Sequence, residues 1–162
     1  MHSADVSARE QFAFSEEQVR QILTELVQKD GISGAVLLAT CNRTELYLSV
    51  QERRFSAEDD AVSQPAMDIS PAELLRQYAH APEKPFTGRV LTEIDAVQHI
   101  MEVACGLHSQ ILHEEQIVTQ VGHAVELARA CRSTDGVLDT LFRTAVSAGK
   151  EAQTQVSVQN VP

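Results

Sequence analysis

Two apolar runs separated by a short polar turn constrain the fold of this chain more than any other feature. Residues 35–39 are continuously apolar, which is typical of a buried strand. After the turn at residues 40–43, apolar side chains alternate with others over residues 46–50, as in a strand with one buried face. Because so few residues join the two runs, we predict an antiparallel β-hairpin.

Helix signals flank this hairpin. Ser15 and Gln18 form a capping box ahead of an apolar stripe, which predicts a first helix. Ser70, followed by Pro71 and Glu73, is a strong second helix start. Residues 89–91, Arg-Val-Leu, are a plausible third strand. Further apolar stripes with helical spacing follow from Thr92 onward; they comprise Ala96, Val97, Ile100, Met101 and Ala104, then Ile117, Val118, Val121, Ala124, Val125 and Ala128, then Val137, Leu138, Leu141, Phe142, Ala145 and Val146.

These signals predict an α+β fold. Residues 1–91 would form a small antiparallel sheet with flanking helices, and residues 92–162 a helical subdomain. At 162 residues, the chain fits one domain with a sizeable core.

Composition narrows the functional classes. The chain is 43% hydrophobic and 22% charged, and no apolar stretch approaches the ~20 residues of a membrane helix. Without a secretory signal, we expect a cytoplasmic protein. The three cysteines are an odd number at irregular spacing, which fits a reducing compartment better than a disulfide framework. A net charge of −10 argues against general nucleic-acid binding and leaves room for a small local contact with RNA.

Cys41 and Arg43 lie in the turn between the two predicted strands. A thiolate is the reactive form of cysteine, and a neighbouring cation favours it. The Arg43 guanidinium is also suited to bind a carboxylate through two hydrogen bonds. Cys41 is therefore a candidate nucleophile beside an anion-binding arginine. The alternative is that Cys41 is a small buried hydrophobic residue at a strand end.

Histidines supply further candidates. His99 lies off the apolar stripe of its predicted helix, so it is a candidate general base or acid. The alternative for His99 is a local hydrogen bond on the helix surface. Cys105 and His108 have C-x-x-H spacing, and His113 follows. This region is a weak candidate for a haem or metal site, and a polar loop is the alternative.

Residues 40–47, Thr-Cys-Asn-Arg-Thr-Glu-Leu-Tyr, resemble the signature of glutamyl-tRNA reductase, the first enzyme of five-carbon tetrapyrrole synthesis. Further segments agree with this family in order and spacing, so the resemblance covers nearly the whole chain. They are residues 9–15, residues 97–100 and 104–107, Ser109, Glu114, Gln116 and Ile117, residues 120–121, residues 141–142 and residues 149–150.

The resemblance implies a mechanism and roles for particular residues. The Cys41 thiolate would attack the ester of glutamyl-tRNA, and NADPH would reduce the resulting thioester to glutamate-1-semialdehyde. Arg43 would hold the substrate carboxylate, and His99 would orient the ester or transfer a proton. Thr40 and Ser109 would be hydrogen-bonding neighbours, while Glu114 and Gln116 would shape the pocket.

The chain also departs from the family pattern. It has no G-x-G-x-x-G fingerprint and hence no visible NADPH site, and the family's first strand is absent. His108 and His113 stand where the family has aspartate and glycine. Glu115 and Thr119 replace a proline and another glycine, and residues 150–154 are less basic than expected.

Three hypotheses follow. The first is the substrate-binding, thioester-forming domain of a glutamyl-tRNA reductase, which reduces only when joined to a nucleotide-binding domain. The second is a non-reducing regulatory module of the same fold that binds haem or a metal through the region of His99, Cys105, His108 and His113. The third is a subunit that docks onto a full-length reductase or another protein. The oligomeric state is open in each case.

Overall fold

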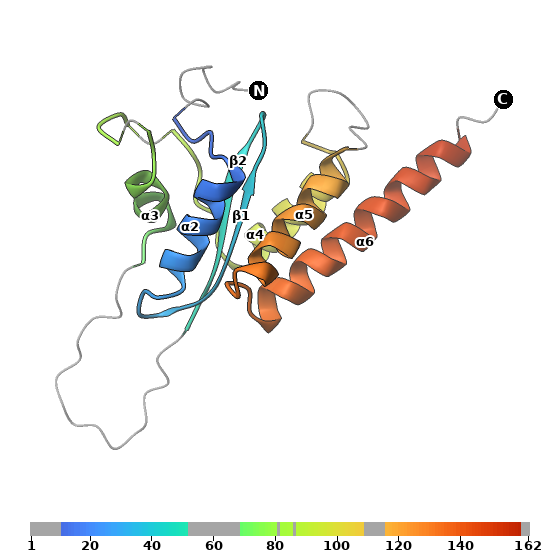
Figure 1. Ribbon diagram of the computed structural model, residues 1–162. Coiled ribbons are helices and arrows are strands. Elements are labelled where there is room, and N and C mark those ends of the chain that lie inside the picture. The colour runs from blue at the N-terminus through green and yellow to red at the C-terminus, as the bar shows by residue number, and fades with distance from the viewer. Residues whose placement is uncertain (1–10, 52–68, 81, 86, 109–115, 160–162) are drawn as a thin grey trace.

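The computed structural model describes residues 11–51, 69–80, 82–85, 87–108 and 116–159. Within these ranges it has five helices and a two-stranded antiparallel sheet, which confirms the α+β class (Figure 1). The elements in chain order are α2 (Glu16–Leu26), β1 (Ile32–Ala39), β2 (Thr44–Val50), α3 (Pro71–Gln77), α4 (Glu93–Ala104), α5 (Gln116–Ala130) and α6 (Gly136–Gln159). No helix in these ranges is both long enough and apolar enough to cross a bilayer.

The predicted hairpin is present, and both strands begin earlier in the sequence than predicted. β1 pairs antiparallel with β2, with Leu38 opposite Glu45 and Ala39 opposite Thr44. The turn closes through the Thr40 backbone, which donates to the Arg43 carbonyl at 2.8 Å. Because a strand's side chains alternate between faces, this register decides which β2 residues point toward which helices.

The third strand predicted at residues 89–91 is wrong. Residues 87–92 have no regular secondary structure, and no backbone hydrogen bond joins them to β2 within the described ranges. Three residues give too short an alternation to identify a strand without a partner for its hydrogen bonds. Val90 is 48% exposed, so the β-branched residue at this position does not indicate a buried strand.

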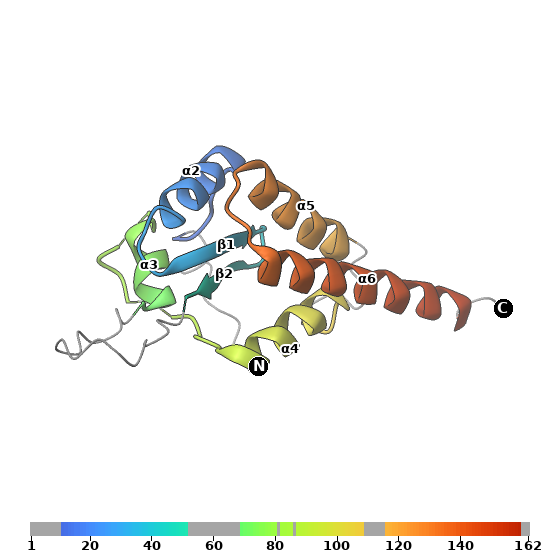
Figure 2. The same cartoon turned by 90° about the horizontal axis from the view of Figure 1, so that it is seen from below.

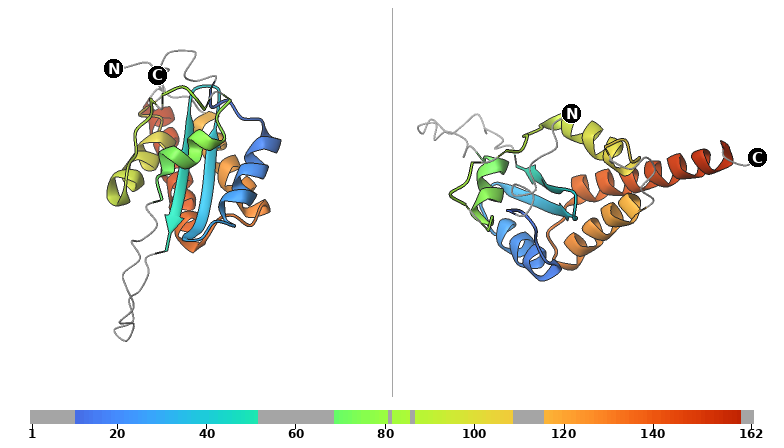
Figure 3. Two further views of the ribbon diagram at one scale, coloured as in Figure 1. Left: turned by 90° about the vertical axis from the view of Figure 1, so that its left-hand side faces the viewer. Right: turned by 90° about the horizontal axis from the view of Figure 1, so that it is seen from above.

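The sheet is enclosed by helices from both predicted halves (Figures 2 and 3). α2 and α5 pack on β1, α3 contacts β2, and α6 contacts both strands. The rings of Tyr47 on β2 and Phe142 on α6 meet edge to face, with centroids 5.0 Å apart. Residues from both halves therefore form one hydrophobic core.

Side-chain capping starts the first two helices as predicted. The Ser15 hydroxyl and the Gln18 side chain form the reciprocal capping box of α2, and the Ser70 hydroxyl accepts from the Glu73 backbone at the start of α3. One residue of α6 that we predicted to lie in the core is exposed. Val137 is 67% exposed because it borders an open cavity beside β2, whereas Leu138 in the same first turn is buried.

The outer edge of β1 is covered by the loop between α5 and α6. The Ala35 N–H donates to the Ser133 carbonyl at 2.7 Å, and the Ser133 hydroxyl donates to the Ala35 carbonyl at 3.0 Å. Ser133 is only 1% exposed, so its hydroxyl needs this partner. No comparable loop pairs with the outer edge of β2 in the described part of the chain.

α6 crosses the end of α4 at Gly149. A Cβ atom at this position would lie 2.5 Å from the Ala104 carbonyl oxygen and 2.7 Å from Val118 Cγ2. Both distances are far shorter than van der Waals contact, so only glycine permits this approach of the helices. Beyond the crossing, α6 extends away from the body of the domain (Figure 1).

This crossing makes a stability prediction. Gly149→Ala is expected to destabilise the fold by about 1–3 kcal/mol, because the backbone carbonyl of Ala104 cannot yield to the added methyl. Gly122→Ala on α5 is the matched control, since its Cβ would meet nothing closer than 3.8 Å. Gly122→Ala should leave the free energy of unfolding unchanged or raise it by up to about 1 kcal/mol, because alanine has the higher helix propensity. Urea unfolding measures the free energy of unfolding of wild type and of both variants. If Gly149→Ala is as stable as Gly122→Ala, the two helices do not cross as closely as described.

Candidate functional site

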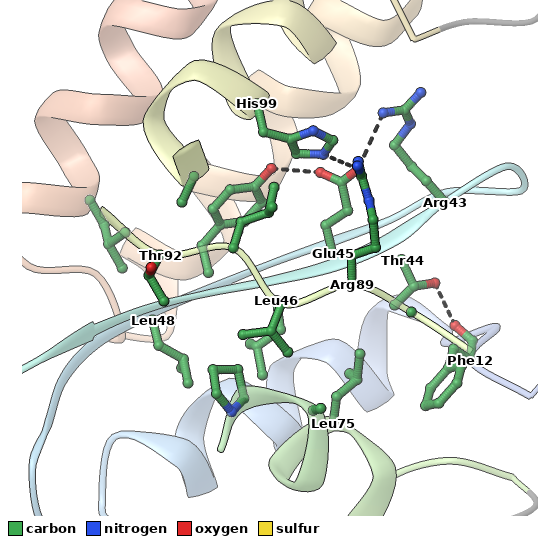
Figure 4. Close-up of a pocket in the computed structure, with 18 of the residues that line it drawn as sticks. Phe12, Arg43, Thr44, Glu45, Leu46, Leu48, Leu75, Arg89, Thr92 and His99 are labelled. Carbon is green, nitrogen blue, oxygen red and sulfur yellow. Dashed lines mark hydrogen bonds and ion pairs between the residues drawn. The ribbon is translucent and has the colours of Figure 1, made fainter. Parts of the chain in front are cut away.

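A cavity of about 990 Å³ runs along β2, and every residue from Thr40 to Val50 lines it. α3, residues 87–92, α4 and the start of α6 form its other walls (Figure 4). Cys41, Arg43, Glu45 and His99 all lie along this cavity, whereas the remaining walls are mostly apolar. The structure thus brings together the three residues that sequence analysis singled out as chemically central, Cys41, Arg43 and His99.

Cys41 is exposed at the tip of the hairpin. The interpretation of this cysteine as a buried hydrophobic residue is therefore wrong. The Thr40 hydroxyl accepts hydrogen bonds from the backbone of Asn42 at 3.2 Å and of Arg43 at 3.1 Å, which holds the turn around the thiol. Thr40 thus shapes the turn, and its predicted contact with substrate stays a prediction.

Glu45 is the centre of a half-buried polar cluster (Figure 4). Its Oε1 accepts from His99 Nε2 at 3.0 Å and from Arg43 Nη1 at 3.2 Å. Its Oε2 accepts from the Tyr47 hydroxyl at 2.6 Å. With the carboxylate as acceptor, His99 Nε2 carries a hydrogen, and Nδ1 of the neutral ring is left as the proton acceptor. The cluster therefore fixes a histidine in one orientation and one tautomer within the cavity.

Electrostatics keep this carboxylate ionised. Burial disfavours the charged form, but the hydrogen bonds from His99 and Tyr47 and the charge of Arg43 outweigh it, so the pKa of Glu45 lies below its ordinary value of 4.5. Burial and the neighbouring Glu45 charge raise the pKa of Tyr47 above its usual range. The Tyr47 hydroxyl hence keeps its proton and remains a donor at neutral pH.

Arg43 links the hairpin to the segment after α4. Its Nη2 donates to the His108 carbonyl oxygen at 3.0 Å, while Nη1 contacts Glu45. A guanidinium has five N–H groups, so these two contacts orient Arg43 and leave other donors for an anion. Its role as the holder of a substrate carboxylate stays a prediction.

The end of α4 places His108 beside His99. Gly106 adopts a positive φ of 78°, which lets the Leu107 N–H turn back onto the Glu102 carbonyl at 2.9 Å. His108 Nε2 then meets Glu102 Oε2 at 2.7 Å, and the rings of His108 and His99 lie 5.0 Å apart. Two histidines, each held by a carboxylate, thus stand next to each other at the edge of the site.

The other predicted site residues are less informative. Ser109, His113 and Glu114 lie outside the described residues. Gln116 is exposed at the start of α5 and does not line the cavity, and Cys105 is half-buried. Among the described residues, no three side chains of the metal-binding types gather around one point. The haem or metal hypothesis, which also involves His113, stays a prediction.

Sequence reasoning missed the roles of Glu45 and Tyr47. Both carry polar atoms in a half-buried strand, and their i, i+2 spacing puts them on one face, opposite to Leu46 and Leu48. A glutamate on such a face needs a partner, and this signal pointed to a buried polar cluster. Its partner, His99, is 54 residues away, so only the tertiary structure identifies the pair.

The Glu45 cluster makes a pH prediction. Because the pKa of Glu45 is depressed, its ionised form stabilises the fold above the ordinary value of 4.5, and this contribution is lost as pH falls through the folded-state pKa. Glu45→Gln should cost about 1–3 kcal/mol at neutral pH, and the difference from wild type should shrink in acid. Urea titrations over a pH series test this, with Glu73→Gln as control because Glu73 forms only an exposed pair with Arg76. A difference independent of pH would contradict the electrostatic origin.

Comparisons with known proteins agree with this geometry. Residues 1–156 match the family described as "Glutamyl-tRNAGlu reductase, N-terminal domain". The "Probable multifunctional siroheme biosynthesis protein HemA" of Ruminiclostridium josui is 37% identical over 99% of this chain and 29% of its own length. The "Glutamyl-tRNA reductase" of Acetivibrio thermocellus is 35% identical over 97% of this chain and 44% of its own.

A solved structure shows the same fold. Glutamyl-tRNA reductase from Methanopyrus kandleri matches 94% of this chain with 32% identity and a TM-score of 0.69, over 32% of that chain. The chain thus spans less than half the length of these relatives. It belongs to the glutamyl-tRNA reductase family and corresponds to the N-terminal domain of that family.

Proposed function

We propose that this chain performs the acyl-transfer step of glutamyl-tRNA reductase, in tetrapyrrole biosynthesis. The observation that carries the proposal is the exposed Cys41 thiol on the same cavity as the oriented His99 and Arg43. A nucleophile, a base within the same cavity and a group that orients the base are the parts that covalent acyl transfer requires. Family membership supports glutamyl-tRNA as the acyl donor.

The step balances as an acyl transfer from an oxygen ester to a thiol. His99 Nδ1 takes the proton of the Cys41 thiol, and the thiolate attacks the carbonyl carbon of the glutamyl ester to form a carbon–sulfur bond. The bond between that carbon and the ribose oxygen of the tRNA breaks, and His99 gives the same proton to the ribose oxygen. We assign this transfer to His99 because Glu45 holds its ring in the cavity. The products are glutamyl-Cys41 and free tRNA.

Arg43 is the proposed contact for the free carboxylate of the glutamyl group. Its side chain is only 15% exposed, so a salt bridge formed here is less screened by water than one at the surface. Glu45 and the His108 carbonyl keep the guanidinium beside the cavity.

The reduction that follows in the family requires NADPH, which supplies hydride to the thioester. The 162 residues contain no G-x-G-x-x-G fingerprint that fits a dinucleotide, so we assign no residue of this chain to it. A thiol nucleophile must remain reduced, and all three cysteines are free. We therefore propose the cytoplasm as the place of this reaction.

The acyl-transfer proposal predicts a covalent adduct. Incubation with glutamyl-tRNA in the absence of NADPH should add one glutamyl group to the protein, as seen by intact-mass spectrometry. Cys41→Ser should abolish the adduct or convert it to a stable ester. Cys131→Ser is the matched control, because this cysteine does not line the cavity. If wild type neither forms an adduct nor releases glutamate, the proposal fails for this chain.

The role of His99 predicts a rate effect. His99→Asn should slow tRNA release by about 10²-fold or more, the contribution expected of a positioned acid or base. Glu45→Gln should slow it less, because the histidine remains but loses its charged partner. Both rates are measured by quenching the reaction at a series of times and determining the amount of deacylated tRNA. Wild-type rates in both variants would remove His99 from the mechanism.

A further inference from the structure

We propose that His108 is a positioning residue for the acyl transfer: its ring holds the ring of His99, and its backbone carbonyl holds Arg43. This inference rests on the proposed function, which assigns His99 and Arg43 to the reaction. The two histidine rings have centroids 5.0 Å apart and are tilted by 41°, and the His108 carbonyl oxygen accepts from Arg43 Nη2 at 3.0 Å. His108 itself does not line the cavity, so it would act through these two residues.

The ring contact supplies what the hydrogen bond to Glu45 lacks. That bond fixes the His99 ring at one atom, Nε2, and a ring held at one atom can still tilt (Figure 4). A second ring at this distance restricts the tilt, because the two flat groups pack against each other. The direction of His99 Nδ1 is thereby fixed as well. A small misplacement of a proton-transferring atom is costly, about 10²-fold in rate for 1 Å.

The His108 ring is held in turn by α4. His108 Nε2 lies 2.7 Å from Glu102 Oε2, and Gln98 Nε2 donates to Glu102 Oε1 at 2.7 Å. The hydrogen bonds from Gln98 and then from His108 keep the pKa of Glu102 below its ordinary value of 4.5. The carboxylate is therefore ionised at neutral pH and accepts from His108. Because Gln98 and Glu102 lie on the same helix as His99, α4 determines the place of both rings.

The backbone of His108 has a support of its own. Gly106 adopts a positive φ of 78°, and the Leu107 N–H then donates to the Glu102 carbonyl at 2.9 Å. This turn brings the His108 carbonyl to Arg43. A Cβ atom at Gly106 would meet nothing within 4 Å, so only the backbone conformation favours glycine here. Substitutions can hence separate the role of the His108 side chain from that of its carbonyl.

Single-turnover formation of glutamyl-Cys41, with the full chain in excess over glutamyl-tRNA, tests the side chain. His108→Ala should lower the maximal rate about tenfold, because His99 loses the neighbouring ring. The protein concentration that gives half of this rate should change by less than about twofold, because the carbonyl beside Arg43 remains. His108→Phe keeps a flat ring, so its maximal rate should lie within about threefold of wild type.

Two further sets of variants serve as controls. His123→Ala removes a histidine that also pairs with a glutamate, on α5 and outside this cavity, and should leave the rate unchanged. Gly106→Asn tolerates a positive φ, whereas Gly106→Val does not. Gly106→Val should therefore lower the maximal rate and also raise the half-saturating concentration several-fold, because the ring and the carbonyl of His108 move together. Gly106→Asn should resemble wild type, and circular dichroism checks that each variant is folded.

NMR of the imidazole nitrogens, with isotope-labelled histidine in the full chain, tests the ring contact without substrate. At a pH where histidine is neutral, His99 should be a single tautomer with its proton on Nε2, and His108→Ala should give averaged signals for this ring. Unchanged His99 signals in His108→Ala would overturn the inference. So would a wild-type maximal rate in His108→Ala, or equal losses in His108→Ala and His108→Phe. If wild type forms no glutamyl adduct, the proposed function fails, and the NMR comparison still decides whether His108 holds His99.

Discussion

The hydrogen-bonded, half-buried carboxylate of Glu45 is the group on which the site depends. A charge withdrawn from water is tolerated only when partners replace the lost water. Two of its partners are local, Tyr47 from the same strand and Arg43 from the turn, whereas His99 comes from α4, 54 residues away. Satisfying one carboxylate thus joins the hairpin to α4 and places the histidine and the arginine on one cavity.

The hairpin gives this cluster its position. Antiparallel pairing ends at Ala39 and Thr44, so the four residues between them form a turn at the cavity, in which Cys41 and Asn42 are exposed. The Cys41 thiol is exposed because it lies in the turn. Glu45 is half-buried because it lies in the paired strand. A thiol on an exposed turn beside rigid elements is accessible to a large molecule without unfolding of the domain.

The same cavity has two regions with different properties. Near the turn it offers a thiol, a guanidinium and a histidine, which suit an anionic acyl substrate. Along β2 its walls are mostly apolar, which suits the uncharged part of a ligand.

The sequence by itself determined the elements and the family. Local signals predicted the hairpin and the caps at Ser15 and Ser70, because turn chemistry and capping involve residues that are close along the chain. The motif at residues 40–47 led to the family, which the comparisons show. The same local signals predicted a strand at residues 89–91 and burial of Val137, and both predictions are wrong. Strand pairing and burial depend on the element that lies opposite, which local signals do not specify.

Only the tertiary structure decided how the chemical groups meet. The pairing of Glu45 with His99 spans 54 residues, and the contact of Arg43 with the His108 carbonyl spans 65. Hydrogen bonds and burial act through space, so a sequence pattern can show that Glu45 needs partners, while the packing of α4 against the hairpin determines which partners it has.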